Sequence, residues 1–277
     1  MIKIKNCRYG PMLYLENDKW TGRSFDLYGE AYQKQIWLME SFIEEGDFVI
    51  DAGANIGAMT IPFSKKVGQT GMVLSFEPQE FLYYVLCGNV AANNLYNVTT
   101  YCEAISDISG DELFCPSARL KNKDGIPFYD DNLQHYGGVS LTEEMRFDTD
   151  CVVSTVAIDD LCLDKCNFIK MDIEGYELQG LAGAEKTIQD YKPILFLESM
   201  PWCLPKISDA VGKLGYVYRS CRIPFYNSDN FFKNGTDVLR DESSPNSPMM
   251  SSDIICYHKD YQSEMDFKYF KAVKDLI

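Results

Sequence analysis

Short apolar runs alternate with amphipathic stretches along the middle of the chain, from about residue 47 to residue 198. This alternation predicts a buried strand at 47–51 and further strands at 71–76, 97–102, 166–171 and 193–197. Apolar residues at helical spacing predict helices at 56–67 (with Pro62 an irregularity inside it), 79–93 and 176–190 (interrupted near Gly183). Strands that alternate with helices are typical of parallel β-α-β units with helices on both faces of the sheet. The pattern therefore predicts an α/β domain with a doubly wound, mostly parallel sheet.

Three regions lie outside this alternation, and we expect them to belong to one domain of residues 1–277. They are an N-terminal extension with a lead-in helix (1–45), an insert (108–155) within the core (46–200), and a C-terminal region (201–277). The last should hold strands 215–220 and 253–257, an exposed polar loop between them, and a terminal helix from residue 261. Connections as long as the insert are usually functional lids or binding loops.

A glycine-containing turn follows the first predicted strand, in the stretch Val49-Ile-Asp-Ala-Gly-Ala-Asn-Ile-Gly57. Glycines let the backbone bend sharply and let a ligand approach the peptide plane. The helix that begins behind them offers free N–H groups, which suit a carboxylate as well as a phosphate. The spacing Gly-x-x-x-Gly differs from the Gly-x-Gly-x-x-Gly of dinucleotide binders. A tight strand-to-helix turn without a ligand is the alternative interpretation.

Two acids follow the next two strands. Glu77 ends the second strand, 20 residues beyond Gly57, where an acid in a doubly wound fold accepts hydrogen bonds from ribose hydroxyls. A solvated carboxylate before the following helix is the alternative. Glu103 follows the third strand, at a place suited to meet an adenine amino group. An exposed loop acid is the alternative for Glu103. Together with the glycine turn, Glu77 indicates a ligand that contains a nucleoside.

Composition narrows the class of protein. The chain carries 26 basic and 41 acidic residues, a net charge of −15, which disfavours nucleic acid as a partner. No apolar run reaches the roughly 18 residues of a membrane span, and no secretory signal is recognisable, so we expect a cytoplasmic protein. Ten cysteines are then reduced thiols. Cys162 and Cys166 are the closest pair, but no second pair and no nearby histidine complete a zinc set, and we expect no metal site.

Two blocks of this sequence resemble the FkbM family of methyltransferases. The first runs from Gly46 through the glycine turn to Gly57 and continues in Ser75-Phe-Glu-Pro78 and residues 89–97. The second is Phe168-Ile-Lys-Met-Asp-Ile-Glu-Gly-Tyr-Glu177, followed by Leu181-Ala-Gly-Ala184 and residues 193–198. The similarity extends over roughly residues 30 to 200, and Asp-x-Glu-Gly-x-Glu before Leu-x-Gly-Ala is distinctive for that family.

The resemblance implies a Rossmann-like class I methyltransferase fold with S-adenosyl-L-methionine as the methyl donor. By position, it implies that four residues line the turn and the methionine end of the donor: Asp51, Gly53, Asn55 and Gly57. It also implies that Glu77 holds the ribose and that Asp172 faces the site of methyl transfer. The N-terminal 30 residues, most of the insert and the chain beyond about residue 200 carry no clear family pattern, so we expect them to select the acceptor.

Methyl transfer to an aliphatic hydroxyl benefits from a nearby base, and the candidates are Asp172, Glu174 and His135. Asp172 and Glu174 point the same way if the strand continues through them and diverge if a turn begins at Asp172. Asp172 could instead bond the cofactor's amino group, and Glu174 could cap the following helix. His135 lies in the insert, and histidine titrates near physiological pH, although a surface histidine is often a bystander.

The leading hypothesis is an O-methyltransferase that acts on a sugar or another small hydroxylated metabolite. The substrate class comes from the resemblance, whereas the residues alone indicate only the cofactor. One alternative is an acceptor that is a glycan or is linked to a lipid, which would need an open groove. Another is a non-catalytic module that binds S-adenosylmethionine. A nicotinamide oxidoreductase is disfavoured by the glycine spacing.

Overall fold

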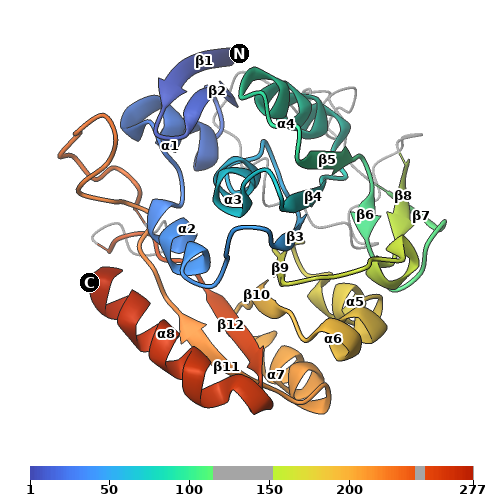
Figure 1. Ribbon diagram of the computed structural model, residues 1–277. Coiled ribbons are helices and arrows are strands. Elements are labelled where there is room, and N and C mark those ends of the chain that lie inside the picture. The colour runs from blue at the N-terminus through green and yellow to red at the C-terminus, as the bar shows by residue number, and fades with distance from the viewer. Residues whose placement is uncertain (115–151, 241–246, 277) are drawn as a thin grey trace.

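A seven-stranded sheet forms the centre of the protein in the computed structural model, which describes residues 1–114, 152–240 and 247–276 (Figure 1). The order across the sheet is β11-β12-β10-β9-β3-β4-β5. The strands are β3 (Phe48–Ala52), β4 (Met72–Phe76), β5 (Val98–Tyr101), β9 (Phe168–Met171), β10 (Ile194–Glu198), β11 (Tyr216–Cys221) and β12 (Asp253–His258). Strand β12 runs antiparallel to both of its neighbours, β10 and β11, and the other pairs are parallel. The predicted mostly parallel sheet is confirmed.

Helices cover both faces of this sheet, as the pattern predicts. One face packs against α5 (Glu177–Ala182), α6 (Glu185–Tyr191) and α7 (Leu204–Lys213) through buried side chains such as Leu181, Ile188 and Val211. The other packs against α2 (Gln33–Glu40), α3 (Thr60–Val67) and α8 (Gln262–Leu276). Helix α4 (Glu80–Ala92) follows β4 and packs within a third cluster of buried residues. Burial on both faces explains why the central strands are mostly apolar.

The helix expected from residue 56 begins later, at Thr60, because residues 55–59 still belong to the turn. Pro62 therefore lies in the first turn of α3, where its missing N–H breaks no helical hydrogen bond. The predicted interruption near Gly183 is confirmed, since α5 ends at Ala182 and α6 begins at Glu185. A Cβ atom on Gly183 would lie 2.0 Å from the Ser106 carbonyl oxygen, so only glycine fits there.

Several elements were not predicted. At the N-terminus, β1 (Ile2–Cys7) and β2 (Gly10–Leu15) form an antiparallel hairpin, which is followed by α1 (Thr21–Tyr28). A small second sheet has the order β6-β8-β7, with β6 (Ala104–Ile105), β7 (Glu112–Phe114) and β8 (Val152–Val156). Two short 3₁₀ turns, η2 (Ile158–Leu161) and η3 (Lys259–Tyr261), complete the described elements. The division into a single domain stays a prediction.

None of the helices in the described part of the chain has the length and apolar character that a membrane crossing requires.

Candidate functional site

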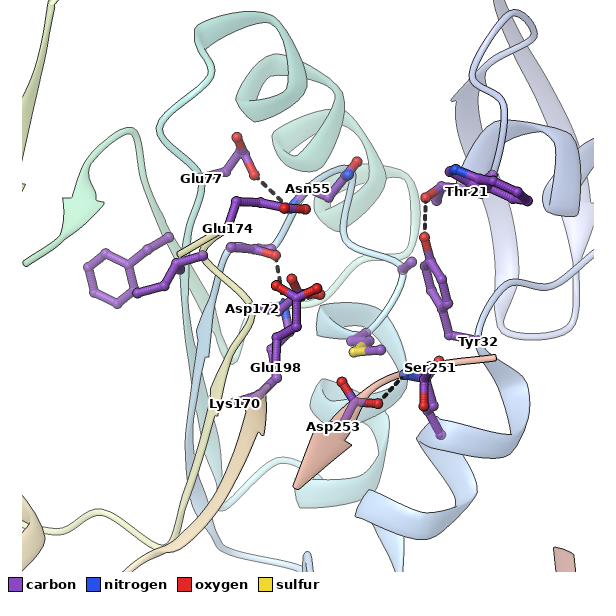
Figure 2. A pocket seen from close by; sticks show the side chains of 18 of the residues that line it. Thr21, Tyr32, Asn55, Glu77, Lys170, Asp172, Glu174, Glu198, Ser251 and Asp253 are labelled. Atoms are coloured by element: carbon purple, nitrogen blue, oxygen red, sulfur yellow. Dashed lines mark hydrogen bonds and ion pairs between the residues drawn. The ribbon is translucent and has the colours of Figure 1, made fainter. Parts of the chain in front are cut away.

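A cleft with a volume of about 230 Å³ opens at the carboxyl ends of the parallel strands (Figure 2). Residues that follow β3, β4, β9 and β10 all contribute to its lining. In a doubly wound sheet this edge is where ligands bind. Of the residues expected to bind the cofactor, four line the cleft, namely Gly53, Asn55, Glu77 and Glu103.

Glu77 fixes the glycine turn (residues 52–57) to the end of β4. Its carboxylate accepts hydrogen bonds from the backbone N–H of Asn55 at 2.8 Å and of Gln79 at 2.9 Å. The side chain is almost fully buried, and this burial raises the pKa of Glu77 to about 7. Each carboxylate oxygen can accept more than one hydrogen bond. Glu77 therefore supports the turn and still offers acceptor capacity to a ligand in the cleft.

Close approach of two chain segments explains the first glycine of the turn. Gly53 has φ of +75°, and a Cβ atom there would lie 1.8 Å from the Asp172 carbonyl oxygen. The N–H groups of Gly53 and Ala54 both donate to the Phe76 carbonyl oxygen at 2.9 Å. The turn is therefore pressed between the ends of β4 and β9, where a larger residue would separate them.

Asp51 and Gly57 do not line the cleft, in contrast to the position expected for them. Asp51 is fully buried and accepts a hydrogen bond from the Thr60 hydroxyl at 2.6 Å. Gly57 has φ of +89°, and a Cβ atom there would lie 2.9 Å from Leu86 Cδ1. Both residues support the glycine turn from the side away from the cleft. Asp51 is in β3, which ends one residue later, and Gly57 packs against Leu86 of α4.

Three carboxylates converge on the other half of the cleft. Asp172 and Glu174 follow β9, and Glu198 ends β10; one oxygen from each lies within 4.8 Å of the others (Figure 2). We call these three residues the acid cluster. Burial is the main cause that raises the pKa of both Glu174 and Glu198, and the negative charges of neighbouring acids raise it further. The cluster therefore favours a neutral, protonated member or a positively charged ligand.

The turn after β9 brings Asp172 and Glu174 together. Strand β9 ends at Met171, so a turn begins at Asp172, and in this case the two side chains were expected to diverge. They converge because Glu174 adopts φ of +55° and Gly175 follows with φ of +99°. A left-handed backbone is unfavourable for glutamate and is often found at functional sites. This conformation reverses the chain and directs the Glu174 carboxylate to the cleft.

The alternative role of Glu174 as a helix cap is wrong. Helix α5 begins at Glu177, and its N-cap residue Tyr176 makes no capping hydrogen bond with its side chain. The N–H groups of Ile173 and Gly175 donate instead to Glu177, at 3.2 and 3.3 Å. Glu177 thus supports the backbone of this loop and leaves the Glu174 side chain for the cleft.

Three further polar residues line the half of the cleft that holds the acid cluster and were not predicted as site residues: Glu198, Lys170 and Asp253. Glu198 and Asp253 are directly opposite each other on β10 and β12. Burial raises the pKa of Asp253 to about 7, although Ser251 and Gln35 bond its side chain. Glu198 could have been found, because it ends a strand beside β9. Lys170 lies within the otherwise apolar β9, and Asp253 begins β12. Neither position belongs to a sequence pattern that predicts a binding site.

The N-terminal region and the loop between β11 and β12 line the same half of the cleft. Tyr32 comes from the lead-in region, and its hydroxyl shares a 2.6 Å hydrogen bond with Thr21 (Figure 2). Its ring packs edge to face on Phe225, with centroids 5.2 Å apart. Phe225 belongs to the loop between β11 and β12. His135, the third candidate base, lies outside the described residues.

The acid cluster is close enough to share a metal ion, but such groups are common without one. The Lys170 ammonium lies 4.0 Å from Asp172 and already supplies a positive charge there. We therefore assign no metal ligands.

Comparisons with known proteins point to one family. The methyltransferase FkbM domain matches residues 51–217. No curated protein matches the chain. Among solved structures, a methyltransferase FkbM from Methylobacillus flagellatus KT aligns with 16% identity and a TM-score of 0.48, over 79% of this chain and 48% of that one. This chain thus spans about half the length of that protein.

Two further structures align at lower scores. A precorrin-6y C5,15-methyltransferase from Geobacter metallireducens GS-15 has 12% identity and a TM-score of 0.46, over 84% of this chain and 94% of that one. A SAM-dependent O-methyltransferase from Thermotoga maritima has 13% identity and a TM-score of 0.43, over 81% and 63%.

Proposed function

Because this chain belongs to the FkbM family of methyltransferases, we propose that it transfers a methyl group from S-adenosyl-L-methionine to a hydroxyl oxygen of a sugar or another small hydroxylated metabolite. The family and the order of the central sheet agree with the Rossmann-like class I methyltransferase fold that the sequence predicts. The acceptor and the choice of oxygen as the methylated atom are part of the proposal.

One observation carries the proposal: a single cleft joins the glycine turn and strand-end acids to the acid cluster. In the first half, Gly53 and Asn55 would hold the methionine end, Glu77 the ribose hydroxyls and Glu103 the adenine amino group. The donor supplies a methyl group that is already activated by the positive sulfonium. We call the second half, which holds the acid cluster, the acceptor half. Its described residues fit the positive charge of the sulfonium, because the acids Asp172, Glu174, Glu198 and Asp253 outnumber the one ammonium, that of Lys170.

The acceptor hydroxyl must lie in line behind the methyl carbon, and its proton must leave as the new C–O bond forms and the C–S bond breaks. We assign Glu174 as the base that takes this proton, because its raised pKa brings it towards neutral pH, where general bases are most effective. Glu198 has a raised pKa as well, and its protonated carboxyl donates a hydrogen bond that orients the acceptor. Asp172 is close to both acids and lies 4.0 Å from the Lys170 ammonium.

Calorimetric titration with S-adenosylhomocysteine, and separately with NAD, tests the cofactor assignment. We expect the first ligand to bind and NAD not to bind. Glu77→Ala should weaken the binding of S-adenosylhomocysteine, since it removes the ribose acceptor and releases the Asn55 N–H. Tight binding of NAD, or equal affinity of Glu77→Ala and wild type for S-adenosylhomocysteine, would contradict the assignment.

A screen of hydroxylated sugars and nucleotide sugars with a labelled methyl donor tests the acceptor class. We expect label in a hydroxyl-bearing product. The net charge of −15 supports a small acceptor over a nucleic acid, whose phosphates would be repelled. Label that enters only an amine, a carbon or RNA would contradict O-methylation of a small hydroxylated metabolite.

A further inference from the structure

Lys170 is a lysine in the middle of β9, buried between the two halves of the cleft. Its side chain is 4% exposed, and its ammonium donates hydrogen bonds to the carbonyl oxygens of Ala52 at 3.1 Å and Gly53 at 2.7 Å. Its Nζ also lies 3.2 Å from Asp51 Oδ1, and the two groups form a buried ion pair. The three contacts hold the ammonium against the beginning of the glycine turn.

A buried ammonium is costly unless other groups compensate its charge. Asp51 is the counter-ion and is directly opposite Lys170 in the pairing of β3 with β9. Asp51 compensates the charge, but the other N–H donors of a buried ammonium also need acceptors. Here the acceptors are the two carbonyl groups that open the glycine turn. Lys170 also lines the cleft, and its ammonium lies 4.0 Å from Asp172 Oδ2 (Figure 2).

We propose that Lys170 is a positioning residue that fixes the glycine turn relative to Asp172, so that cofactor binding and the geometry of the acceptor half depend on the same ammonium. This inference rests on the proposed function. The turn and the Asp172 segment are already in contact, since Asp172 N–H donates to the Ala52 carbonyl oxygen at 3.2 Å. Lys170 bonds that same carbonyl oxygen through its side chain.

The charge of Lys170 acts on both halves of the cleft. Acids face it from every strand end around it: Asp51 on β3, Glu77 after β4, Asp172 and Glu174 after β9, Glu198 on β10 and Asp253 on β12. The ammonium opposes the effect of burial and lowers the pKa of Glu77, Glu174 and Asp253. Activity should rise with pH as the base, Glu174, loses its proton. Loss of the Lys170 charge should raise the pKa of Glu174 and therefore shift this rise to higher pH.

The test must separate positioning from simple neutralisation of Asp51. Lys170→Met removes the donors and leaves Asp51 buried without a partner for its charge, so this variant can fail through instability. Asp51→Asn combined with Lys170→Met removes both charges, and the introduced amide oxygen would still accept the Thr60 hydrogen bond. Lys165→Met is the matched control, because Lys165 donates to the Gly46 carbonyl oxygen at the opposite end of β3, away from the cleft.

We expect the double variant to melt cooperatively and to bind S-adenosylhomocysteine about tenfold or more weakly than wild type, as for the loss of hydrogen bonds from a charged donor. Its kcat should rise with pH at a higher pH than that of wild type. Lys165→Met should match wild type in both measurements. Wild-type affinity and pH profile in a folded double variant would overturn the inference, because Lys170 would then serve only to neutralise Asp51.

Failure of the proposed function has a different outcome. Wild type and Lys165→Met would then both fail to bind S-adenosylhomocysteine, which would overturn this inference together with the function it rests on. If wild type binds S-adenosylhomocysteine and the double variant stays folded, the difference between their affinities measures the role of Lys170. Asp51→Asn contributes little to this difference, because the amide oxygen keeps the Thr60 hydrogen bond.

Discussion

The acids of the cleft are held in two different ways. Both oxygens of Glu77 accept backbone N–H groups, so its position is fixed by the chain around it. Glu174 is placed by its left-handed backbone, and Glu198 by the end of β10. Burial raises the pKa of both Glu77 and Glu174, but backbone N–H donors oppose this effect at Glu77, whereas neighbouring acids add to it at Glu174. The first arrangement suits recognition of a ligand and the second suits proton transfer.

Replacement of Glu174 by glutamine should lower kcat about 10²- to 10⁴-fold, because the amide cannot take a proton from the acceptor. The affinity for S-adenosylhomocysteine should change little. Steady-state kinetics and calorimetry on the same preparation measure the two quantities. Glu185→Gln is the control, since Glu185 is an exposed acid on α6 that accepts a hydrogen bond from Gln189 on the same helix. Unchanged kcat in Glu174→Gln would transfer the role of base to another residue, with His135 next to be tested.

Single elements differ in how far the sequence predicts them. Strands β3, β4, β9 and β10 are predicted, because burial on both faces makes each a mostly apolar run. Strand β5, a partly buried edge strand, is predicted as the next strand in the alternation of strands and helices. The hairpin β1–β2 is missed, since alternate residues of β1 are exposed and no such run results. In the same way, Gly53 and Glu77 are predicted from a local pattern, whereas Lys170 and Asp253 become site residues only through the pairing of distant strands.

Asn89 of α4 is a buried side chain that bonds the N-terminal hairpin to the rest of the protein. Its amide donates to the carbonyl oxygens of Ile56 at 2.7 Å and Leu13 at 3.0 Å, and its oxygen accepts the Leu13 N–H at 2.6 Å. Asn89→Ala should lower the free energy of unfolding by about 2–4 kcal/mol, because buried backbone groups lose their partners.

Urea denaturation measures this loss. Tyr96→Ala is the control from the same part of the chain: Tyr96 is 93% exposed and should change the free energy of unfolding by at most about 0.5 kcal/mol. A loss in Asn89→Ala as small as that of the control would show that the Asn89 hydrogen bonds contribute little, and that apolar packing and other contacts, such as the bond from Asn93 to the Pro11 carbonyl oxygen, hold the hairpin.

At the scale of the whole molecule, the buried acids of the cleft link stability to pH. Burial raises the pKa of Glu77 to about 7 and of Asp253 to about 7, and it also raises the pKa of Glu174 and Glu198. The folded protein therefore binds more protons than the unfolded chain between the ordinary carboxyl pKa and neutral pH. Stability from such groups is complete at low pH and is lost as pH rises through the folded-state pKa values.

Without ligand, the melting temperature should therefore fall as pH rises from about 5 to about 8. Glu198→Gln should flatten this dependence, because the amide has no proton to lose. Thermal melts in buffers matched for ionic strength provide the measurement. A melting temperature that rises over the same interval would show that the folded state holds these acids ionised, contrary to the burial described here.

A crystal structure of the protein with S-adenosylhomocysteine tests most directly whether the cleft is the methyl-donor site. We expect the ribose hydroxyls on Glu77, the amino-acid end at Gly53 and Asn55, and the sulfur facing the acid cluster. Electron density for the ligand outside the cleft would contradict this assignment. The reverse orientation, with the adenine against the acid cluster, would contradict it as well.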